Sequence, residues 1–406
     1  RRQSVVYLAG TAGVRPVVPT DSDRLARAAE RAMSPEAWAY VAGGAGRGAT
    51  MDANRQAFEA RRIVPRVLRD ASVRSMTSTI CGTAFPAPIA LAPIGVLEMV
   101  HAEADRAVAM AAAALGVPMT ISSQASVPME AIAAAAPSAP RWFQLYWSRD
   151  DALVESFVAR AERTGCSAIV LTLDTTMLGW RPQDLDLAWL PFARGMGIAQ
   201  YTSDPVFQRA VRDAAMPETP APPLTLETLR TAWQMRSRVP GGLGFARRAV
   251  RRFLETYSRP SLQWDDLARL RAMTTLPILL KGILHADDAR RAVDAGVDGI
   301  VVSNHGGRQI DGAVATLDAL LAIVTATSGQ CPVLLDSGVR SGADVFKAVA
   351  LGASAVLLGR PYVYGLAIAG QAGVQQVIED VIAEFDLTMG LAGCRSLEEV
   401  RACGLA

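Results

Sequence analysis

This chain of 406 residues has few histidines, no closely paired cysteines and no large excess of either charge. It contains three histidines, and no two of its five cysteines, at positions 81, 166, 331, 394 and 403, form a C-x-x-C pair. Cysteines scattered in this way indicate reduced thiols in a cytosolic protein rather than a disulfide scaffold. No clustered spacing of histidine, cysteine and aspartate predicts a metal site.

Long apolar runs and a strong charge imbalance are missing as well. No run reaches the roughly 18–20 apolar residues that a membrane span needs. The basic start at Arg1 and Arg2 is followed by no apolar segment of the kind found in signal peptides. A net charge of +2 does not indicate nucleic acid as the main partner. We therefore expect a cytoplasmic protein whose partners are small molecules rather than nucleic acid or a membrane.

The chain does contain a regular alternation of short apolar runs with amphipathic helical patterns. Eight strands that alternate with helices are the signature of a (β/α)8 barrel, an α/β fold. A doubly wound open sheet is the alternative, but it usually has fewer strands and a glycine fingerprint after the first one. The eight predicted strands lie within 88–95, 119–125, 142–147, 168–175, 277–283, 299–306, 332–338 and 355–361.

Two segments fall outside this alternation. Residues 1–87 are predicted to form an N-terminal helical segment that packs on a barrel of residues 88–400, and Ser34 followed by Pro35 opens one of its helices. Residues 182–262, after the fourth strand, are too long for an ordinary connection and are predicted to form a lid or binding loop. Prolines and glycines are expected to interrupt continuous elements there: Pro217, Pro220, Pro222, Pro223, Pro240, Gly241, Gly242 and Gly244.

The stretch 301–309 holds the strongest indication of chemistry. The apolar run that ends at Val302 delivers Ser303, Asn304, His305 and then Arg308 in quick succession. The C-terminal ends of barrel strands are where such enzymes keep their active sites, and of the three histidines only His305 occupies such a place. The structural alternative is a strand end with a capping histidine.

The other strand ends carry polar groups too, and together they predict one active site. Asp174 beside His305 would orient the imidazole for proton abstraction, and Arg181 with Arg308 would suit a carboxylate ligand. Lys281 could stabilise developing negative charge or form a Schiff base. The strand ends supply Pro93, Ile94, Gly95, Ser122, Ser123, Gln144, Tyr146, Thr172, Asp174, Lys281, Ser303, His305, Asp336 and Arg360.

The loops after the seventh and eighth predicted strands indicate a phosphate site. They are rich in glycine, which lets backbone amides approach an anion, and each leads into a helix N-terminus. Arg340 and Arg360 would add charge-assisted contacts. Ordinary glycine-containing turns are the alternative. A phosphate-bearing cofactor or substrate is predicted.

Five motifs together resemble the FMN-dependent α-hydroxy acid oxidases, a family that includes glycolate oxidase, lactate oxidase, mandelate dehydrogenase and lactate 2-monooxygenase. The resemblance runs from about residue 30 to 400. The lactate 2-monooxygenase branch is the most similar, because of Gly179-Trp180-Arg181-Pro182, Ser337 in place of the usual glycine, the N-terminal stretch from Val6 and the long fourth insertion. The motifs are Phe143-Gln144-Leu145-Tyr146, Leu171-Thr172-Leu173-Asp174-Thr175, Leu280-Lys281-Gly282, Ser303-Asn304-His305-Gly306-Gly307-Arg308-Gln309 and Asp336-Ser337-Gly338-Val339-Arg340.

The resemblance implies FMN as the cofactor and a role for each matched residue. His305 would take a proton from the substrate, Asp174 would raise its proton affinity, and Tyr146 would hydrogen-bond the substrate hydroxyl. Arg308, Arg181 and Tyr40 would hold the substrate carboxylate, with Gln124 beside the substrate. Lys281 would stabilise reduced flavin. The remaining flavin contacts would come from Pro93, Ile94, Gly95, Ser122, Gln144, Thr172, Ser303, Asp336, Ser337, Gly338, Arg340, Gly359 and Arg360.

The function expected from this resemblance is oxidation of a lactate-like (S)-2-hydroxy acid to its 2-oxo acid with O2 as acceptor. Retained product would be decarboxylated, as in a lactate 2-monooxygenase, whereas early release would make the protein a simple oxidase that yields hydrogen peroxide. A quinone- or cytochrome-linked dehydrogenase on a larger or aryl substrate is the further alternative. In that case the basic stretch 245–257 would contact the membrane or the partner protein. A solvated face or a subunit contact is nevertheless the favoured interpretation of this stretch. A homo-tetramer or octamer is also implied, and Gln124 departs from several relatives and leaves the substrate's size open.

Overall fold

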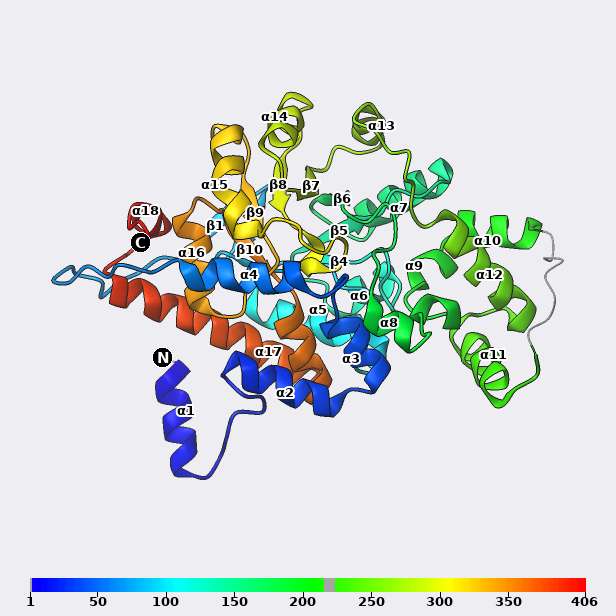
Figure 1. Ribbon diagram of the computed structural model, residues 1–406, viewed down its shortest axis with the longest axis horizontal. Helices are drawn as coiled ribbons and strands as arrows, with labels where there is room; N and C mark the ends of the chain where they lie inside the picture. The colour runs from blue at the N-terminus through cyan, green and yellow to red at the C-terminus, as the bar shows by residue number, and fades with distance from the viewer. Residues whose placement is uncertain (1, 215–222) are drawn as a thin grey trace.

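Eight parallel strands close into a barrel in the computed structural model, which describes residues 2–214 and 223–406 (Figure 1). Neighbouring strands pair in the order β10-β3-β4-β5-β6-β7-β8-β9, so each strand lies beside the next in sequence and the last lies beside the first. This arrangement confirms the predicted (β/α)8 barrel. The strands are β3 Ile89–Leu91, β4 Met119–Ile121, β5 Arg141–Leu145, β6 Ile169–Thr172, β7 Ile278–Ile283, β8 Gly299–Val302, β9 Val333–Leu335 and β10 Ala355–Leu358.

The helices between the strands form at the predicted amphipathic stretches. In α7, for example, the Asp150 side chain caps the N-terminus by accepting from the Leu153 backbone amide, and Val154, Phe157 and Val158 are buried on one face. The helices of the barrel layer are α5 Ala104–Leu115, α6 Met129–Ala135, α7 Asp151–Arg163, α13 Asp266–Met273, α14 Ala286–Asp294, α15 Thr316–Thr327, α16 Gly342–Ala350, α17 Arg360–Ala392 and α18 Leu397–Arg401, with the short 3-10 turn η1 at Leu97–Met99. Within the described residues no helix is both long and apolar enough to cross a membrane.

The N-terminal end of the barrel is closed by a hairpin that the sequence does not predict. Its strands are β1 Ser78–Ile80 and β2 Thr83–Phe85. Phe85 lies 5.7 Å, between ring centroids, from the buried Trp142 of β5, and the Trp142 indole N–H donates to Thr83 Oγ1 at 2.9 Å. The hairpin thus plugs the end of the barrel that lies opposite the predicted active site.

The N-terminal segment consists of α1 Arg2–Thr11, α2 Ser22–Ala32, α3 Pro35–Ala42 and α4 Ala49–Ala60 before the hairpin. As predicted, Ser34 caps α3, with Pro35 in its first turn. The C-terminal end of α3 reaches the barrel, because the backbone carbonyls of Val41 and Gly43 accept from Arg360 at 3.0 and 2.9 Å. The division of the chain at residue 87 stays a prediction.

The long connection between β6 and β7 is mostly helical. It contains α8 Pro182–Asp186, η2 Pro191–Arg194, α9 Ala199–Thr202, α10 Pro205–Asp213, α11 Leu226–Arg238 and α12 Gly242–Thr256, and the last three helices lie together at one end of the molecule (Figure 1). As expected, the chain breaks between α11 and α12 at Pro240, Gly241 and Gly242, where the two glycines have φ of 105° and 83°; the expectation is wrong for Gly244, which lies inside α12. Pro217, Pro220 and Pro222 lie outside the described residues.

Buried contacts attach this insertion to the barrel layer. Arg160 of α7 pairs with Asp204 at 3.0 Å, and the Asp204 side chain also caps α10. Phe253 of α12 lies 4.8 Å from Tyr201 and 5.1 Å from Phe192, measured between ring centroids. The insertion therefore packs as a cluster of helices with its own aromatic core.

Candidate active site

One pocket opens at the C-terminal ends of the barrel strands and collects most of the predicted site residues. Some of the predicted residues do not line it and lie next to residues that do: Asp174 is half-buried, and Ser122, Ser123, Gln144, Thr172 and Ser303 are buried. The predicted residues that line it are Tyr40, Pro93, Ile94, Gly95, Gln124, Tyr146, Arg181, Lys281, His305, Arg308, Asp336, Ser337, Gly338, Arg340, Gly359 and Arg360.

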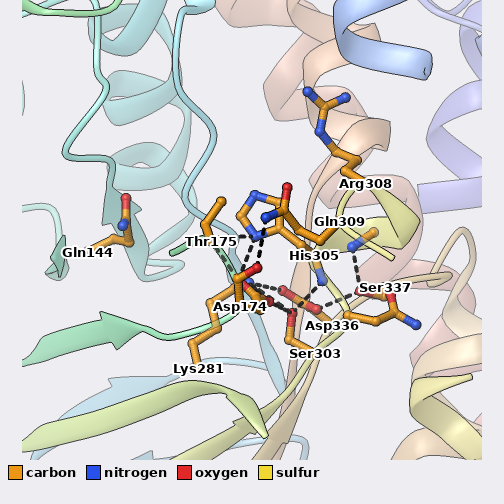
Figure 2. A network of polar contacts seen from close by, with 12 residues as sticks. Gln144, Asp174, Thr175, Lys281, Ser303, His305, Arg308, Gln309, Asp336 and Ser337 are labelled. Carbon is orange, nitrogen blue, oxygen red and sulfur yellow. Dashed lines mark hydrogen bonds and ion pairs between the residues drawn. The ribbon is translucent and has the colours of Figure 1, made fainter. Parts of the chain in front are cut away.

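His305 and Asp174 meet across the mouth of the barrel, as the sequence predicts. His305 follows β8 and Asp174 follows β6, and His305 Nδ1 lies 2.8 Å from Asp174 Oδ1 (Figure 2). Because a carboxylate accepts, Nδ1 carries the proton in neutral His305 and Nε2 is left as the basic nitrogen. The other two histidines make local hydrogen bonds: His101 accepts from the Glu103 amide, and His285 caps α14 by accepting from the Asp287 amide.

Lys281 connects the same carboxylate to the rest of the site. Its ammonium lies 3.1 Å from Asp336 Oδ2 and 3.8 Å from Asp174 Oδ2, and it donates to Ser303 Oγ at 2.8 Å. Ser303 Oγ in turn donates to Asp174 Oδ2 at 3.3 Å. Four strand ends, those of β6, β7, β8 and β9, are joined through this network (Figure 2).

The charges in this network shift one another's pKa values. Burial acts to raise the pKa of Asp174, but Lys281 and His305 outweigh it and hold that pKa well below its usual range. Burial lowers the pKa of His305, and Asp174 partly offsets this effect. Burial opposes the charge on Lys281, yet Asp174 and Asp336 raise its pKa. At neutral pH the site thus holds a neutral imidazole beside an ionised carboxylate and an ammonium, as a proton-accepting site requires.

Four arginines around the pocket are arranged to receive anions. Among the described residues none of them forms an ion pair with a carboxylate. Their donors meet backbone carbonyls, an amide oxygen (Arg181 to Gln309 Oε1 at 2.9 Å) and, for Arg360, also Met51 Sδ at 3.7 Å. Burial and the neighbouring Arg181 lower the pKa of Arg308 to about 9, and burial and Arg360 lower that of Arg340 to about 10. Because an uncompensated buried cation is costly, these residues fit anionic ligands.

The buried polar atoms of the barrel also fit a flavin. In the described part of the chain, Gln144 Nε2 and Thr172 Oγ1 are buried and have no hydrogen-bond partner. The other end of the Gln144 amide is occupied, since Oε1 accepts from Ser122 Oγ and from the Ser123 amide. A free donor and a free hydroxyl at adjacent strand ends suit the polar edge of a ring system that carries both acceptors and donors.

Several residues at the site were missed by sequence reasoning. Thr175 donates to Asp174 Oδ1 at 2.9 Å and lines the pocket; its position next to Asp174 was the available signal. Gln309 donates to the Asp174 carbonyl at 2.8 Å. The far wall of the pocket has no signal of its own in the sequence, because it is formed where the insertion folds back: Leu178, Leu190, Phe192, Leu254 and Tyr257.

Comparisons with known proteins agree with this site. A model of the FMN-dependent dehydrogenase family matches residues 29–405. The chain is 43% identical to an L-lactate oxidase of Lysinibacillus sphaericus (strain C3-41), over 90% of this chain and 87% of that protein. It is 42% identical to a 4-hydroxymandelate oxidase of Amycolatopsis orientalis, over 93% and 95%. A crystal structure of mandelate oxidase matches with a TM-score of 0.77 and 39% identity, covering 96% of this chain and 98% of that one.

The barrel and its pocket define an α/β-barrel oxidoreductase. The chain belongs to the FMN-dependent α-hydroxy acid oxidase and dehydrogenase family, as its motifs predict, and its cofactor is FMN.

Proposed function

We propose that this protein oxidises an (S)-2-hydroxy acid to the corresponding 2-oxo acid with O2 as the electron acceptor. The observation that carries the proposal is the His305–Asp174 pair at 2.8 Å, set at a pocket whose arginines have no carboxylate partner among the described residues. A basic imidazole next to carboxylate-binding groups suits a substrate that carries a carboxylate and an adjacent C–H or O–H proton.

We assign the FMN contacts to the buried polar groups and the arginines described above. Gln144, Thr172 and Lys281 would hold the polar edge of the ring, and the backbone around Ile94 would lie against it. Arg340 and Arg360 would bind the phosphate. When bound, FMN supplies the two-electron acceptor of the reaction and, once reduced, the reactivity toward oxygen.

The substrate contacts follow from the same geometry. Arg308 and Arg181 would bind the carboxylate, and Arg308 is held in place by Tyr40, whose ring centroid lies 4.8 Å from the guanidinium carbon. Burial, followed by Asp174, raises the pKa of Tyr146 to about 12, so its phenol stays protonated and can donate to the substrate hydroxyl. His305 Nε2 then takes a proton from the substrate, and Asp174 stabilises the imidazolium that results.

The wall formed by the insertion supports a role in the fate of the product. Leu190, Phe192, Leu254 and Tyr257 close the far side of the pocket. If they delay product release, hydrogen peroxide would convert the retained 2-oxo acid to a carboxylic acid one carbon shorter, with carbon dioxide and water. This outcome is the lactate 2-monooxygenase-like reaction, whereas release of the oxo acid with peroxide is that of a simple oxidase.

Two alternatives have less support. A Schiff base at Lys281 requires a neutral amine, but Asp174 and Asp336 raise the pKa of Lys281. Docking to a membrane or cytochrome through α12 would use its basic charge, but two of the four arginines of this helix are engaged in ion pairs: Arg251 with Glu255 at 2.7 Å and Arg252 with Asp150 at 3.3 Å.

The proposal is tested by anaerobic mixing of the FMN-loaded protein with a panel of 2-hydroxy acids while the flavin absorbance is followed. Bleaching by one acid, and recolouring in air, is expected; analysis of the products then separates decarboxylated acid from oxo acid plus peroxide. His305→Gln should bind FMN normally without bleaching. A flavin that no acid in the panel bleaches would contradict the proposed reaction, and slow recolouring in air would favour the dehydrogenase.

A further inference from the structure

The turn that carries His305 has an unusual backbone. The residues His305, Gly306 and Gly307 all adopt left-handed conformations, with φ of 58°, 67° and 74°, in the short turn η3 His305–Gly307. Such a conformation is strained for a residue with a side chain. A residue remains in it only where its surroundings hold it there, and such residues cluster at functional sites.

Three side-chain oxygens hold this turn by its backbone amides. The His305 amide donates to Ser303 Oγ at 3.1 Å, and the Gly307 amide donates to Asn304 Oδ1 at 3.1 Å. Both of these acceptors belong to the same strand end as the turn itself. The Gly306 amide instead donates to Ser337 Oγ at 2.8 Å. Of the three acceptors, Ser337 is therefore the one that attaches the turn to a different strand, β9 (Figure 2).

Ser337 also has a left-handed backbone, with φ of 71°. Glycine would adopt this conformation without strain, so the backbone alone gives no reason for a serine here. The Ser337 hydroxyl can only accept from the Gly306 amide, and its proton is therefore donated to Asp336 Oδ1, at 2.8 Å. The other oxygen of Asp336 pairs with Lys281. The hydroxyl thus joins the His305 turn to the charged network that ends at Asp174.

We propose that Ser337 is a positioning residue that clamps the strained His305 turn to β9 and keeps the imidazole in its working orientation. Its hydroxyl is used by two protein groups, a role separate from the flavin contact predicted for this residue, which lines the pocket. The effect of the clamp on catalysis rests on the proposed function, in which His305 is the base; the clamp itself does not. Hydrogen bonds in such a chain strengthen one another, so the loss of this hydroxyl should be felt at His305.

The test compares Ser337→Gly with Ser337→Ala in the FMN-loaded enzyme. Both remove the hydroxyl, but only glycine also relieves the backbone strain at this position, so a purely conformational role would let the glycine variant improve on the wild type and leave the alanine variant little changed. We expect kcat to fall on the order of 10-fold in both, as for one lost hydrogen bond, with KM changed less than about twofold. Amide hydrogen exchange of the 304–309 segment, measured without substrate, should accelerate in both variants.

Ser328 provides a matched control. It too is a serine with a left-handed backbone (φ 48°), but it ends α15 at an exposed site and its hydroxyl donates only to the nearby Thr325 carbonyl, at 3.3 Å. Ser328→Gly and Ser328→Ala should leave kcat and the exchange of 304–309 unchanged. The inference would be overturned if amide exchange of 304–309 were as slow in both Ser337 variants as in the wild type. It would also be overturned if exchange were faster but kcat were unchanged. If no hydroxy acid bleaches the wild-type flavin, the proposed function fails while hydrogen exchange still decides the clamp.

Discussion

Asp174 is the residue on which the charges of this site converge. It contacts His305, Lys281, Ser303 and Thr175, yet it does not line the pocket. In the proposed function it would therefore act on the substrate through His305, by fixing the tautomer and by stabilising the protonated imidazole. Sequence reasoning could pair Asp174 with His305, because both follow barrel strands. It could not find the Ser337 clamp, since a hydrogen bond between two loops has no sequence signature.

A pH profile tests the pair at this scale. Because burial lowers the pKa of His305, the acid limb of kcat/KM should lie below the ordinary histidine value of about 6.5. In Asp174→Asn the opposing influence of the carboxylate is lost, so this limb should move to still lower pH. The plateau should fall on the order of 10²-fold or more. An acid limb that moves upward in Asp174→Asn would contradict this assignment.

Thr175→Val is the matched control for that profile. The Thr175 hydroxyl donates to the same Asp174 oxygen as His305 does, at 2.9 Å, but it carries no charge. Removing this neutral hydrogen bond should lower kcat/KM by about 10-fold or less. The acid limb should stay nearer to that of the wild type than in Asp174→Asn.

At the scale of elements, the insertion differs most from its sequence-based description. Its prolines and glycines indicate a loop, whereas α10, α11 and α12 form a packed cluster. The aromatic contacts among Phe192, Tyr201 and Phe253 explain the difference, because burial of these rings outweighs weak local propensities. Such contacts join residues about 50 positions apart, which no local pattern encodes. By contrast the barrel strands are predictable, since each is a continuous apolar run.

Asp204→Ala tests whether this cluster controls product release. Asp204 is fully buried, pairs with Arg160 at 3.0 Å and caps α10 through the Val206 amide at 2.8 Å. Its loss leaves a buried guanidinium less well compensated and should destabilise the fold by about 3–5 kcal/mol. With the wall loosened, we expect a larger fraction of oxo acid and peroxide relative to decarboxylated acid.

The control for Asp204→Ala is Glu255→Gln, which breaks the exposed pair between Arg251 and Glu255 on α12. An exposed pair contributes at most about 1 kcal/mol, so neither the denaturation midpoint nor the product ratio should change appreciably. An unchanged product ratio in an Asp204→Ala protein that is clearly destabilised would separate stability of the insertion from product retention.

The whole molecule divides stability and chemistry between the two ends of one barrel. The C-terminal end carries the charged pocket, while the N-terminal end is sealed by apolar side chains of the hairpin, including Ile80 and Phe85. Barrel enzymes tolerate this division because the chemistry resides in the loops after the strands. The general placement of the site could be predicted from strand order alone. The hairpin could not, because its two strands of three residues each give too short a pattern.

Phe85→Ala tests this division. Phe85 is 1% exposed and packs on Trp142, so truncation leaves a cavity at the sealed end and should lower the free energy of unfolding by about 3–5 kcal/mol. Urea denaturation measures this loss. Below the denaturation transition, kcat and KM should stay within about twofold of the wild type, because the affected end is remote from His305. Phe85→Leu, which keeps most of the volume, should restore much of the stability. A kcat that fell in Phe85→Ala while the protein remained folded would show that the packing inside the barrel also positions the strand ends that carry the site.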